Sequence, residues 1–189
     1  HRDVLRIMVE NPDPVAVHSR LPDDDTPSPS GNDADLSMIP HLAASALSLY
    51  ETRDKTELYL ESEMRGVAPC LSEVVGPLVG ARLIQSAGGL MRLARLPSST
   101  IQVLGAEKMF FKFLKDGGKP PKHGIIFQHP WVHSLPSRKR GKMARSIAGS
   151  AALASRMDAF GQGDPAPLKK RLEERRKRIL DMEIGPAKG

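Results

Sequence analysis

The sequence of 189 residues contains a single cysteine, Cys70, and this scarcity excludes two kinds of site. One thiol cannot form an intrachain disulfide, and it cannot supply the ligands of a multi-cysteine zinc site. The chain also lacks a secretory signal and any apolar run near the roughly 18 residues that a membrane-spanning helix needs. We therefore expect a soluble protein of a reducing intracellular compartment, with no membrane partner.

Aromatic residues are also scarce, at 4% of the chain, whereas hydrophobic residues make up 40% and include much Ala and Leu. This composition is typical of helices packed through small and aliphatic side chains rather than of a β-sandwich. The glycines Gly76, Gly80 and Gly88 lack the strand-then-helix setting of a dinucleotide or phosphate loop. The sequence therefore predicts an all-α fold without a nucleotide site.

Acidic residues are absent from 117–157, a stretch that carries eight Lys or Arg and three of the six His residues. The net charge of +6 conceals a division between the two parts of the chain. Residues 1–80 hold 6 Lys or Arg against 14 Asp or Glu, and residues 81–189 hold 22 against 8. Segregated positive charge is the electrostatic signature of a polyanion-binding surface, which we place in the C-terminal part.

A short helix expected over 105–114 precedes this basic stretch and is apolar on more than one side. Phe110, Phe113 and Leu114 share one side at helical spacing, while Met109 and Phe111 point elsewhere. Burial in the core is one interpretation, because helices that are apolar all round are usually interior. The alternative is that a partner covers the second side.

The remaining pattern predicts four segments. Residues 1–40 combine a short helix with a flexible acidic connection, because 11–40 are rich in Pro, Asp and Ser. Residues 41–66 form a long helix, residues 67–182 form the helical domain, and residues 183–189 form a tail. A basic helix over 168–182 is either a solvated face or a further contact with phosphates.

No catalytic, metal or cofactor site emerges from the sequence. His123, His129 and His133 are irregularly spaced in a loop without a nearby carboxylate, and Cys70 lacks a nucleophile signature. We therefore expect a protein that is not an enzyme, with no cofactor.

Several blocks in the same order resemble the Nop domain family: LSLYETRD, MRGVAP, GPLVGARLIQSAGGL, GAEKMFFKFL, PKHGIIFQHPWV, RGKMAR and SRMDAF. The resemblance covers about 41–160 and implies a Nop-type helical domain behind a shortened coiled-coil remnant at 41–66. It implies a noncatalytic scaffold of box C/D guide ribonucleoproteins, which direct 2′-O-methylation of RNA, in a prokaryotic, archaeal-like cytoplasm. The implied partners are a kink-turn RNA and a small ribosomal-type protein that binds the kink-turn. Fibrillarin would join only through an N-terminal domain outside this chain, and the coiled-coil remnant admits a homodimer.

The resemblance also implies roles for individual residues. The expected RNA contacts are Lys108, Lys119, Lys122, Gln128, Arg138, Lys139, Arg140, Lys142 and Arg145. The expected interface with the partner protein comprises Ala106, Glu107, Met109, Phe110 and Phe113. Two departures from the family pattern are Ala148-Gly149-Ser150, where a Lys is usual, and Cys70, where an Asn is common.

Two other functions remain open from the sequence. One is a stand-alone RNA-binding relative that works without fibrillarin, and the other is a protein-interaction module whose basic face binds an acidic protein. We predict that Phe110→Ala risks unfolding the domain, because the loss of an aromatic side chain from a core costs about 3 to 5 kcal/mol.

Overall fold

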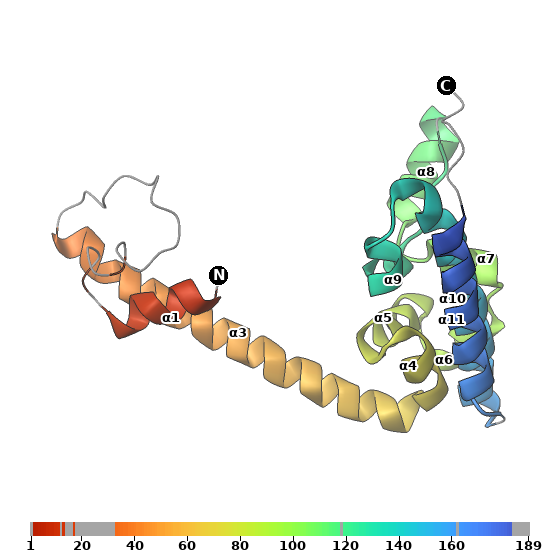
Figure 1. Cartoon of the computed structure of the whole chain (residues 1–189), viewed down its shortest axis with the longest axis horizontal. Helices are drawn as coiled ribbons and strands as arrows, with labels where there is room; N and C mark the ends of the chain where they lie inside the picture. The colour runs from red at the N-terminus through yellow and green to blue at the C-terminus, as the bar shows by residue number, and fades with distance from the viewer. Residues whose placement is uncertain are drawn as a thin grey trace. The chain divides into compact units, whose positions relative to one another are not determined.

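The computed structural model describes residues 2–11, 13, 17, 33–117, 119–161 and 163–182. Within these ranges the regular elements are all helices, as the sequence predicts, and no strand occurs (Figure 1). The chain divides into two compact units, His1–Leu58 and Tyr59–Gly189. No helix in the described ranges combines the length and apolar character that crossing a membrane requires.

The first unit contains α1 (Arg2–Glu10) and most of α3 (Asp33–Val67). The Arg2 guanidinium donates to both carboxylate oxygens of Asp54, at 2.6 and 2.8 Å, and lies over the Tyr50 ring. This fork-shaped pairing is the geometry that arginine offers to a carboxylate, and it joins α1 to α3.

The predicted start of the long helix at residue 41 is wrong. Helix α3 begins at Asp33 and runs through Pro40, so the last part of the expected flexible connection is helical. A composition rich in Pro, Asp and Ser favours irregular chain over 11–40, but α3 accommodates Pro40 within its first turns. Most of the rest of the predicted connection, and the predicted tail at 183–189, lie outside the described residues.

The second unit is built around α10 (Ser137–Phe160), which contacts α4 (Pro69–Val75), α6 (Leu90–Arg95), α7 (Ser98–Val103) and α11 (Ala166–Asp181). Helix α5 (Pro77–Ala87) packs on α4 and α6. The unit is completed by α8 (Glu107–Asp116), a 3-10 turn η1 (Ile125–Gln128) and α9 (Pro130–His133).

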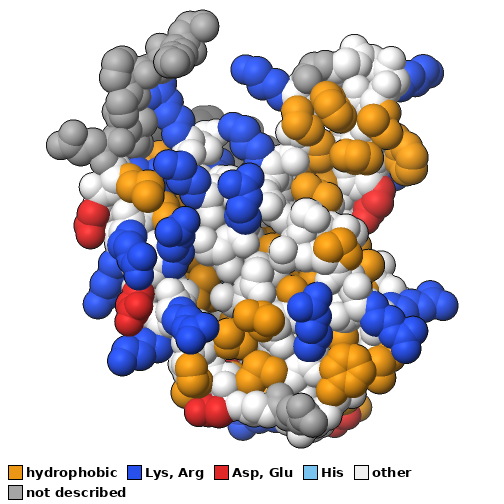
Figure 2. Space-filling model, turned by 90° about the vertical axis from the view of Figure 1, so that its right-hand side faces the viewer, with side chains coloured by type: hydrophobic (Ala, Val, Ile, Leu, Met, Phe, Trp, Pro, Cys, Tyr) orange, Lys and Arg blue, Asp and Glu red, His pale blue; other side chains and the backbone are white. Residues whose placement is uncertain are grey.

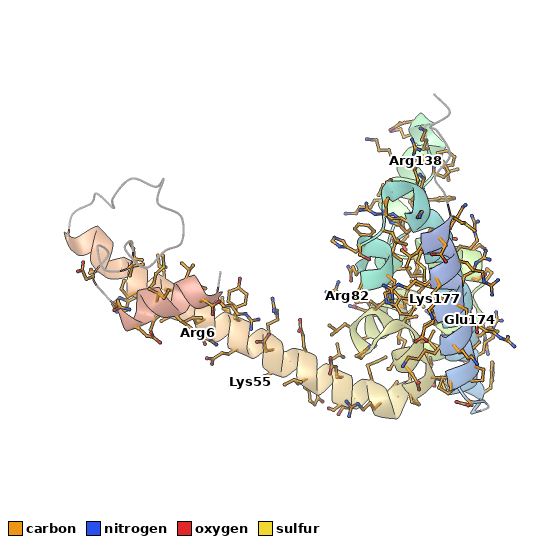
Figure 3. All side chains as sticks on the ribbon, in the orientation of Figure 1. Arg6, Lys55, Arg82, Arg138, Glu174 and Lys177 are labelled. Atoms are coloured by element: carbon orange, nitrogen blue, oxygen red, sulfur yellow. The ribbon has the colours of Figure 1, made fainter. Side chains whose placement is uncertain are left out.

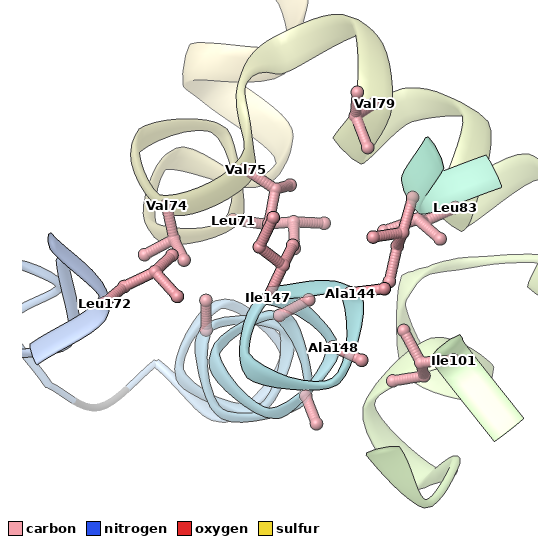
Figure 4. Close-up of a cluster of buried hydrophobic side chains, with 14 of the residues drawn as sticks. Leu71, Val74, Val75, Val79, Leu83, Ile101, Ala144, Ile147, Ala148 and Leu172 are labelled. Carbon is pink, nitrogen blue, oxygen red and sulfur yellow. The ribbon is translucent and has the colours of Figure 1, made fainter. Parts of the chain in front are cut away.

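Small side chains let α10 serve as the central helix. Ala144, Ala148 and Ala151 are fully buried, and they allow the surrounding helices to approach closely. Figure 4 shows Ile147 facing Leu71 across this core. Each fully buried aliphatic side chain of this size contributes about 1.5 to 3 kcal/mol, so the core is sufficient to hold the helices that carry the exposed surfaces.

A carboxylate from α10 secures the start of α4. Asp158 accepts hydrogen bonds from the backbone N–H groups of Cys70 and Leu71, each at 2.8 Å. The first N–H groups of a helix have no partner within the helix, and the positive end of the helix dipole favours a carboxylate there. Asp158 therefore joins the end of α10 to the start of α4, although it follows Cys70 by 88 residues and Leu71 by 87 residues in the sequence.

Candidate functional site

The turn between α7 and α8 is locked against the loop that contains η1. Gly124 N–H donates to Gln102 O at 2.9 Å, and Ile125 N–H donates to Leu104 O at 2.8 Å. Gly105 has a φ of +84°, and a Cβ at this position would lie 2.6 Å from Ile125 Cγ1. The close approach requires glycine, so the base of α8 has a defined position beside η1.

Helix α8 stands out from the core with its apolar side chains in solvent. None of its residues is buried, and Met109, Phe110, Phe111 and Leu114 are all exposed. Figure 2 shows hydrophobic side chains gathered on the upper lobe of this face, where α8 lies. A core position for this helix is therefore excluded, and the estimate that Phe110→Ala costs as much as a core aromatic is wrong, because Phe110 is 41% exposed.

The polar side of α8 is a row of lysines. Lys108, Lys112 and Lys115 recur at i, i+4 and i+7, which places them on one side of a helix. The five apolar residues occupy most of the rest of the circumference, with Glu107 at the start of the helix and Asp116 at its end. Helix α8 thus presents a cationic strip and a broad apolar surface next to each other.

A hollow of about 400 Å³ opens between α7 and the base of α8. It is lined by Ser99, Thr100, Val103, Leu104, Glu107, Phe110 and Phe111. Glu107 is fixed there because its Oε1 accepts from Gly105 N–H at 2.7 Å, and Ala106 is buried beneath it. Of the expected interface residues, Ala106 therefore supports the surface from below, and Phe110 lines the hollow.

The loop after α8 carries two of the expected cations at the surface. Lys119 and Lys122 are exposed. The backbone carbonyl of Lys122 accepts from Gln102 Nε2 at 2.7 Å, and its side chain lies against Gly141 of α10. The structure therefore brings Lys122 to the basic start of α10.

The 3-10 turn η1 anchors this loop to the core. Ile126 is fully buried, whereas Gln128 is exposed and its Oε1 accepts a hydrogen bond from Arg82 of α5. His129 caps α9 by accepting from Trp131 N–H at 3.1 Å. Burial, assisted by the charge of Arg176, lowers the pKa of His129 to about 4, so its imidazole is neutral at pH 7.

Two of the expected RNA-binding cations are engaged within the chain. Arg140 Nε donates to Leu135 O at 2.7 Å and its guanidinium lies over the Phe127 ring, so it holds the loop to α10. Lys139 Nζ donates to Leu180 O at 2.7 Å, at the C-terminus of α11, where helix carbonyls lack partners. These contacts give Arg140 and Lys139 a structural role whether or not they also meet RNA.

The other cations at the start of α10 reach the surface, and Lys142 Nζ also lies 3.5 Å from Met182 Sδ. Arg138, Lys142 and Arg145 are exposed, and their spacing of four and three residues places them on one side of the helix. The structure thus brings the loop lysine Lys122 and the α10 cations together around the N-terminus of α10, where the helix dipole also favours an anion.

Sequence reasoning missed several exposed residues of this region. Lys112 and Lys115 extend the lysine row from Lys108, and their i, i+4, i+7 spacing was a signal that could have found them. Arg82 was not detectable, because only folding brings α5 beside Gln128.

The described residues contain no group of three or more His, Cys, Asp or Glu that could hold a metal ion. Cys70 is buried, and desolvation together with Asp158 raises the pKa of its thiol to about 11. A thiol with this pKa is protonated at neutral pH and is a poor nucleophile.

A family model described as "Nop: snoRNA binding domain, fibrillarin" matches residues 23–181. The chain belongs to the Nop family. This Nop chain is 46% identical over 143 residues to an uncharacterised NOP5 family protein of Methanocaldococcus jannaschii, covering 76% of this chain and 34% of the relative. It is 40% identical over 140 residues to nucleolar protein 56 of Homo sapiens, covering 74% of this chain and 24% of the relative.

Nucleolar protein 58 of Mycosarcoma maydis is 44% identical to this Nop chain over 133 residues, which cover 70% of the chain and 23% of the relative. The crystal structure of a fibrillarin/Nop5p complex aligns with a TM-score of 0.57 and 31% identity, covering 94% of this chain and 61% of that chain. The Nop chain thus spans about a third or less of the length of the curated relatives it matches. The expectation of a Nop-type helical fold is confirmed.

Proposed function

We propose that this Nop chain is a noncatalytic scaffold that binds a kink-turn RNA together with a small ribosomal-type protein. The observation that carries the proposal is the exposed surface of α8, where a lysine row adjoins a wide apolar area. Exposed apolar surface of this kind indicates a protein partner, and clustered lysines indicate phosphates. The family description as a snoRNA-binding domain supports the RNA component.

On this proposal the cations divide by position. Lys108 at the base of α8, Lys119 and Lys122 in the loop, and Arg138, Lys142 and Arg145 on α10 neutralise the RNA backbone. Lys139 and Arg140 contribute charge to the same region while they hold α11 and the loop in place. Gln128 contacts RNA through its amide NH₂ group, because its carbonyl oxygen accepts from Arg82.

The small protein partner covers the apolar side of α8. Met109, Phe110 and Phe113 make this contact, with Phe111 and Leu114 added because the structure exposes or half-exposes all five side chains. Ala106 and Glu107 support the helix start beneath the contact. Specificity then depends on a composite surface of RNA and protein rather than on base readout.

We further propose that the RNA belongs to box C/D guide particles for 2′-O-methylation, since the relatives include nucleolar proteins 56 and 58 and the structural neighbour is a complex with fibrillarin. The exposed side chains Leu42 and Leu49 on α3 leave surface for a second copy of the chain.

A gel-shift series tests the proposal with a kink-turn RNA, in the presence and absence of its ribosomal-type binder. We expect a ternary complex that needs the binder. With about six phosphate contacts, the logarithm of the association constant should fall with the logarithm of salt concentration at a slope of about −4. Equal RNA affinity without the binder contradicts the composite surface, and a slope near zero favours the alternative in which the basic face binds an acidic protein.

A further inference from the structure

Helix α11 carries a row of arginines that the proposed function does not use. The helix docks on the core through Leu172 and Ile179, which are buried at i and i+7. Arg171, Arg175 and Arg178 follow the same i, i+4, i+7 rule on one flank of that buried stripe, and all three are exposed. The side of α11 that faces away from the core carries Lys170 and Lys177 together with Glu174, a mixture of charges.

Helix α10 presents a matching row on its outer side. Arg138, Lys142, Arg145 and Arg156 are exposed and recur at spacings that keep them on one side of the helix. Arg156 is held in place because its Nε donates to Ala94 O at 3.0 Å. At 1.5 Å per residue, the row extends about 27 Å from Arg138 to Arg156.

Contacts at both ends show that the two rows are neighbours. At one end Lys142 Nζ lies 3.5 Å from Met182 Sδ, next to the last turn of α11. At the other end Arg156 and Arg171 line the same groove, whose floor includes Met157 and Leu168. Since α10 and α11 pack against each other, the rows run side by side, in a region where Figure 2 shows many Lys and Arg side chains.

We define the two-helix basic face by these seven cations: Arg138, Lys142, Arg145, Arg156, Arg171, Arg175 and Arg178. The acidic residues beside it are Asp164, in the groove, and Glu174, which pairs with Arg178 at 3.8 Å. Figure 3 shows Arg138 near the beginning of α10, and Glu174 and Lys177 on α11. Seven cations therefore stand against two acids on the face, with an uncharged stretch of α10 between Arg145 and Arg156.

We propose that the two-helix basic face binds the phosphate backbone of a double-stranded RNA stem that continues from the kink-turn. The inference rests on the proposed function and assigns α11 as an additional RNA-binding element. Duplex RNA is recognised through shape and through phosphate and 2′-hydroxyl contacts across its shallow minor groove, and two parallel rows of cations on packed helices suit two strands. A protein partner would need a buried apolar centre, whereas the apolar floor of Met157 and Leu168 lies at one end of the face, beside Arg156 and Arg171 and apart from the row from Arg138 to Arg145.

The test compares two variants of the full chain that remove equal charge from one helix. Arg171→Gln/Arg175→Gln removes two cations of the face, and Lys170→Gln/Lys177→Gln removes two cations from the outward side. Gln has nearly the same helix propensity as Arg and Lys, and neither pair touches Leu172 or Ile179, so both variants should keep the melting temperature of the parent.

Binding is measured by salt titration with the ribosomal-type binder present, on a kink-turn RNA with a long flanking stem and on the same RNA with that stem removed. For the long stem we expect the arginine pair to weaken binding about tenfold and to reduce the salt slope by about 2 units, since each phosphate contact contributes about one. The lysine pair should change the affinity less than about twofold, and on the short RNA the two variants should agree.

Equal losses for the two pairs on the long-stem RNA would overturn the inference, because that outcome reflects net charge alone. Unchanged RNA affinity in the arginine pair, with lost binding of an acidic polypeptide such as polyglutamate, would overturn it in favour of a protein partner. If the parent chain does not recognise the kink-turn, the proposed function fails, and a plain RNA duplex serves as the probe. A difference between the two pairs on that duplex supports the basic face independently, and equal affinities refute it.

Discussion

Replacing Phe111 with alanine should separate partner binding from folding more clearly than any other change on α8. Phe111 is 67% exposed and lines the hollow between α7 and α8. The greater part of its side chain is therefore available to a partner, and the smaller part is already covered by the chain itself. The matched control is Phe160→Ala on α10, because Phe160 is 58% exposed outside the proposed protein interface; it lines the groove assigned to the flanking stem, so the RNA in this assay is the one without that stem.

Full burial of a phenylalanine side chain contributes about 1.5 to 3 kcal/mol. Two thirds of this value is about 1 to 2 kcal/mol, which corresponds to a loss of roughly 5- to 30-fold in affinity for the small partner protein on RNA. The remaining third implies that Phe111→Ala reduces the free energy of unfolding by about 0.5 to 1 kcal/mol, and the buried two fifths of Phe160 imply about 0.6 to 1.3 kcal/mol for Phe160→Ala.

The assay is titration of the kink-turn RNA, saturated with its ribosomal-type binder, with parent chain and both variants. Urea unfolding followed by circular dichroism reports the stability of each variant. We expect Phe111→Ala to weaken the ternary complex and Phe160→Ala to leave it unchanged. Equal affinities for Phe111→Ala and the parent would refute the assignment of α8 as the protein-facing helix.

Lys108→Ala and Arg145→Ala should each weaken the ternary complex several-fold in gel shifts. Neither should lower the melting temperature, because both side chains are exposed. An Arg145→Ala protein that melts early but keeps its RNA affinity per folded molecule would show a structural role instead. Asp158→Ala should lower the free energy of unfolding in urea by about 2 to 4 kcal/mol, since two charge-assisted hydrogen bonds to α4 are lost. The control Asp164→Ala, at an exposed helix start, should lower it by less than about 1 kcal/mol. Equal losses would contradict the capping role of Asp158. Because burial lowers the pKa of His129 to about 4, its neutral form stabilises the fold above pH 6.5, and this contribution is lost as the pH falls toward 4. His129→Asn keeps a capping acceptor and should remove that part of the pH dependence of the unfolding free energy. An unchanged dependence of the unfolding free energy on pH would show that His129 does not carry it.

Much of the second unit was predictable because its signals are local. The helical class and the short helix expected over 105–114, which the structure places at Glu107–Asp116, follow from composition, periodicity and glycine punctuation. The start of α3 was not predictable in this way, because proline usually interrupts a helix and the structure accommodates Pro40 within α3. The exposure of α8 remained one of two interpretations, since an apolar periodicity does not reveal which side finds a neighbour.

The sequence by itself determined the helical class, the membership of the Nop family and the segregation of positive charge toward the C-terminal part, because composition, motif order and charge are properties of the chain. Only the tertiary structure decided which cations act together. Lys139 and Arg140 donate hydrogen bonds to backbone carbonyls within the chain, and Arg82 donates one to Gln128. The arginines of α11 lie beside those of α10. These pairings join residues up to 46 positions apart, and such contacts depend on how helices pack around α10 rather than on any local pattern.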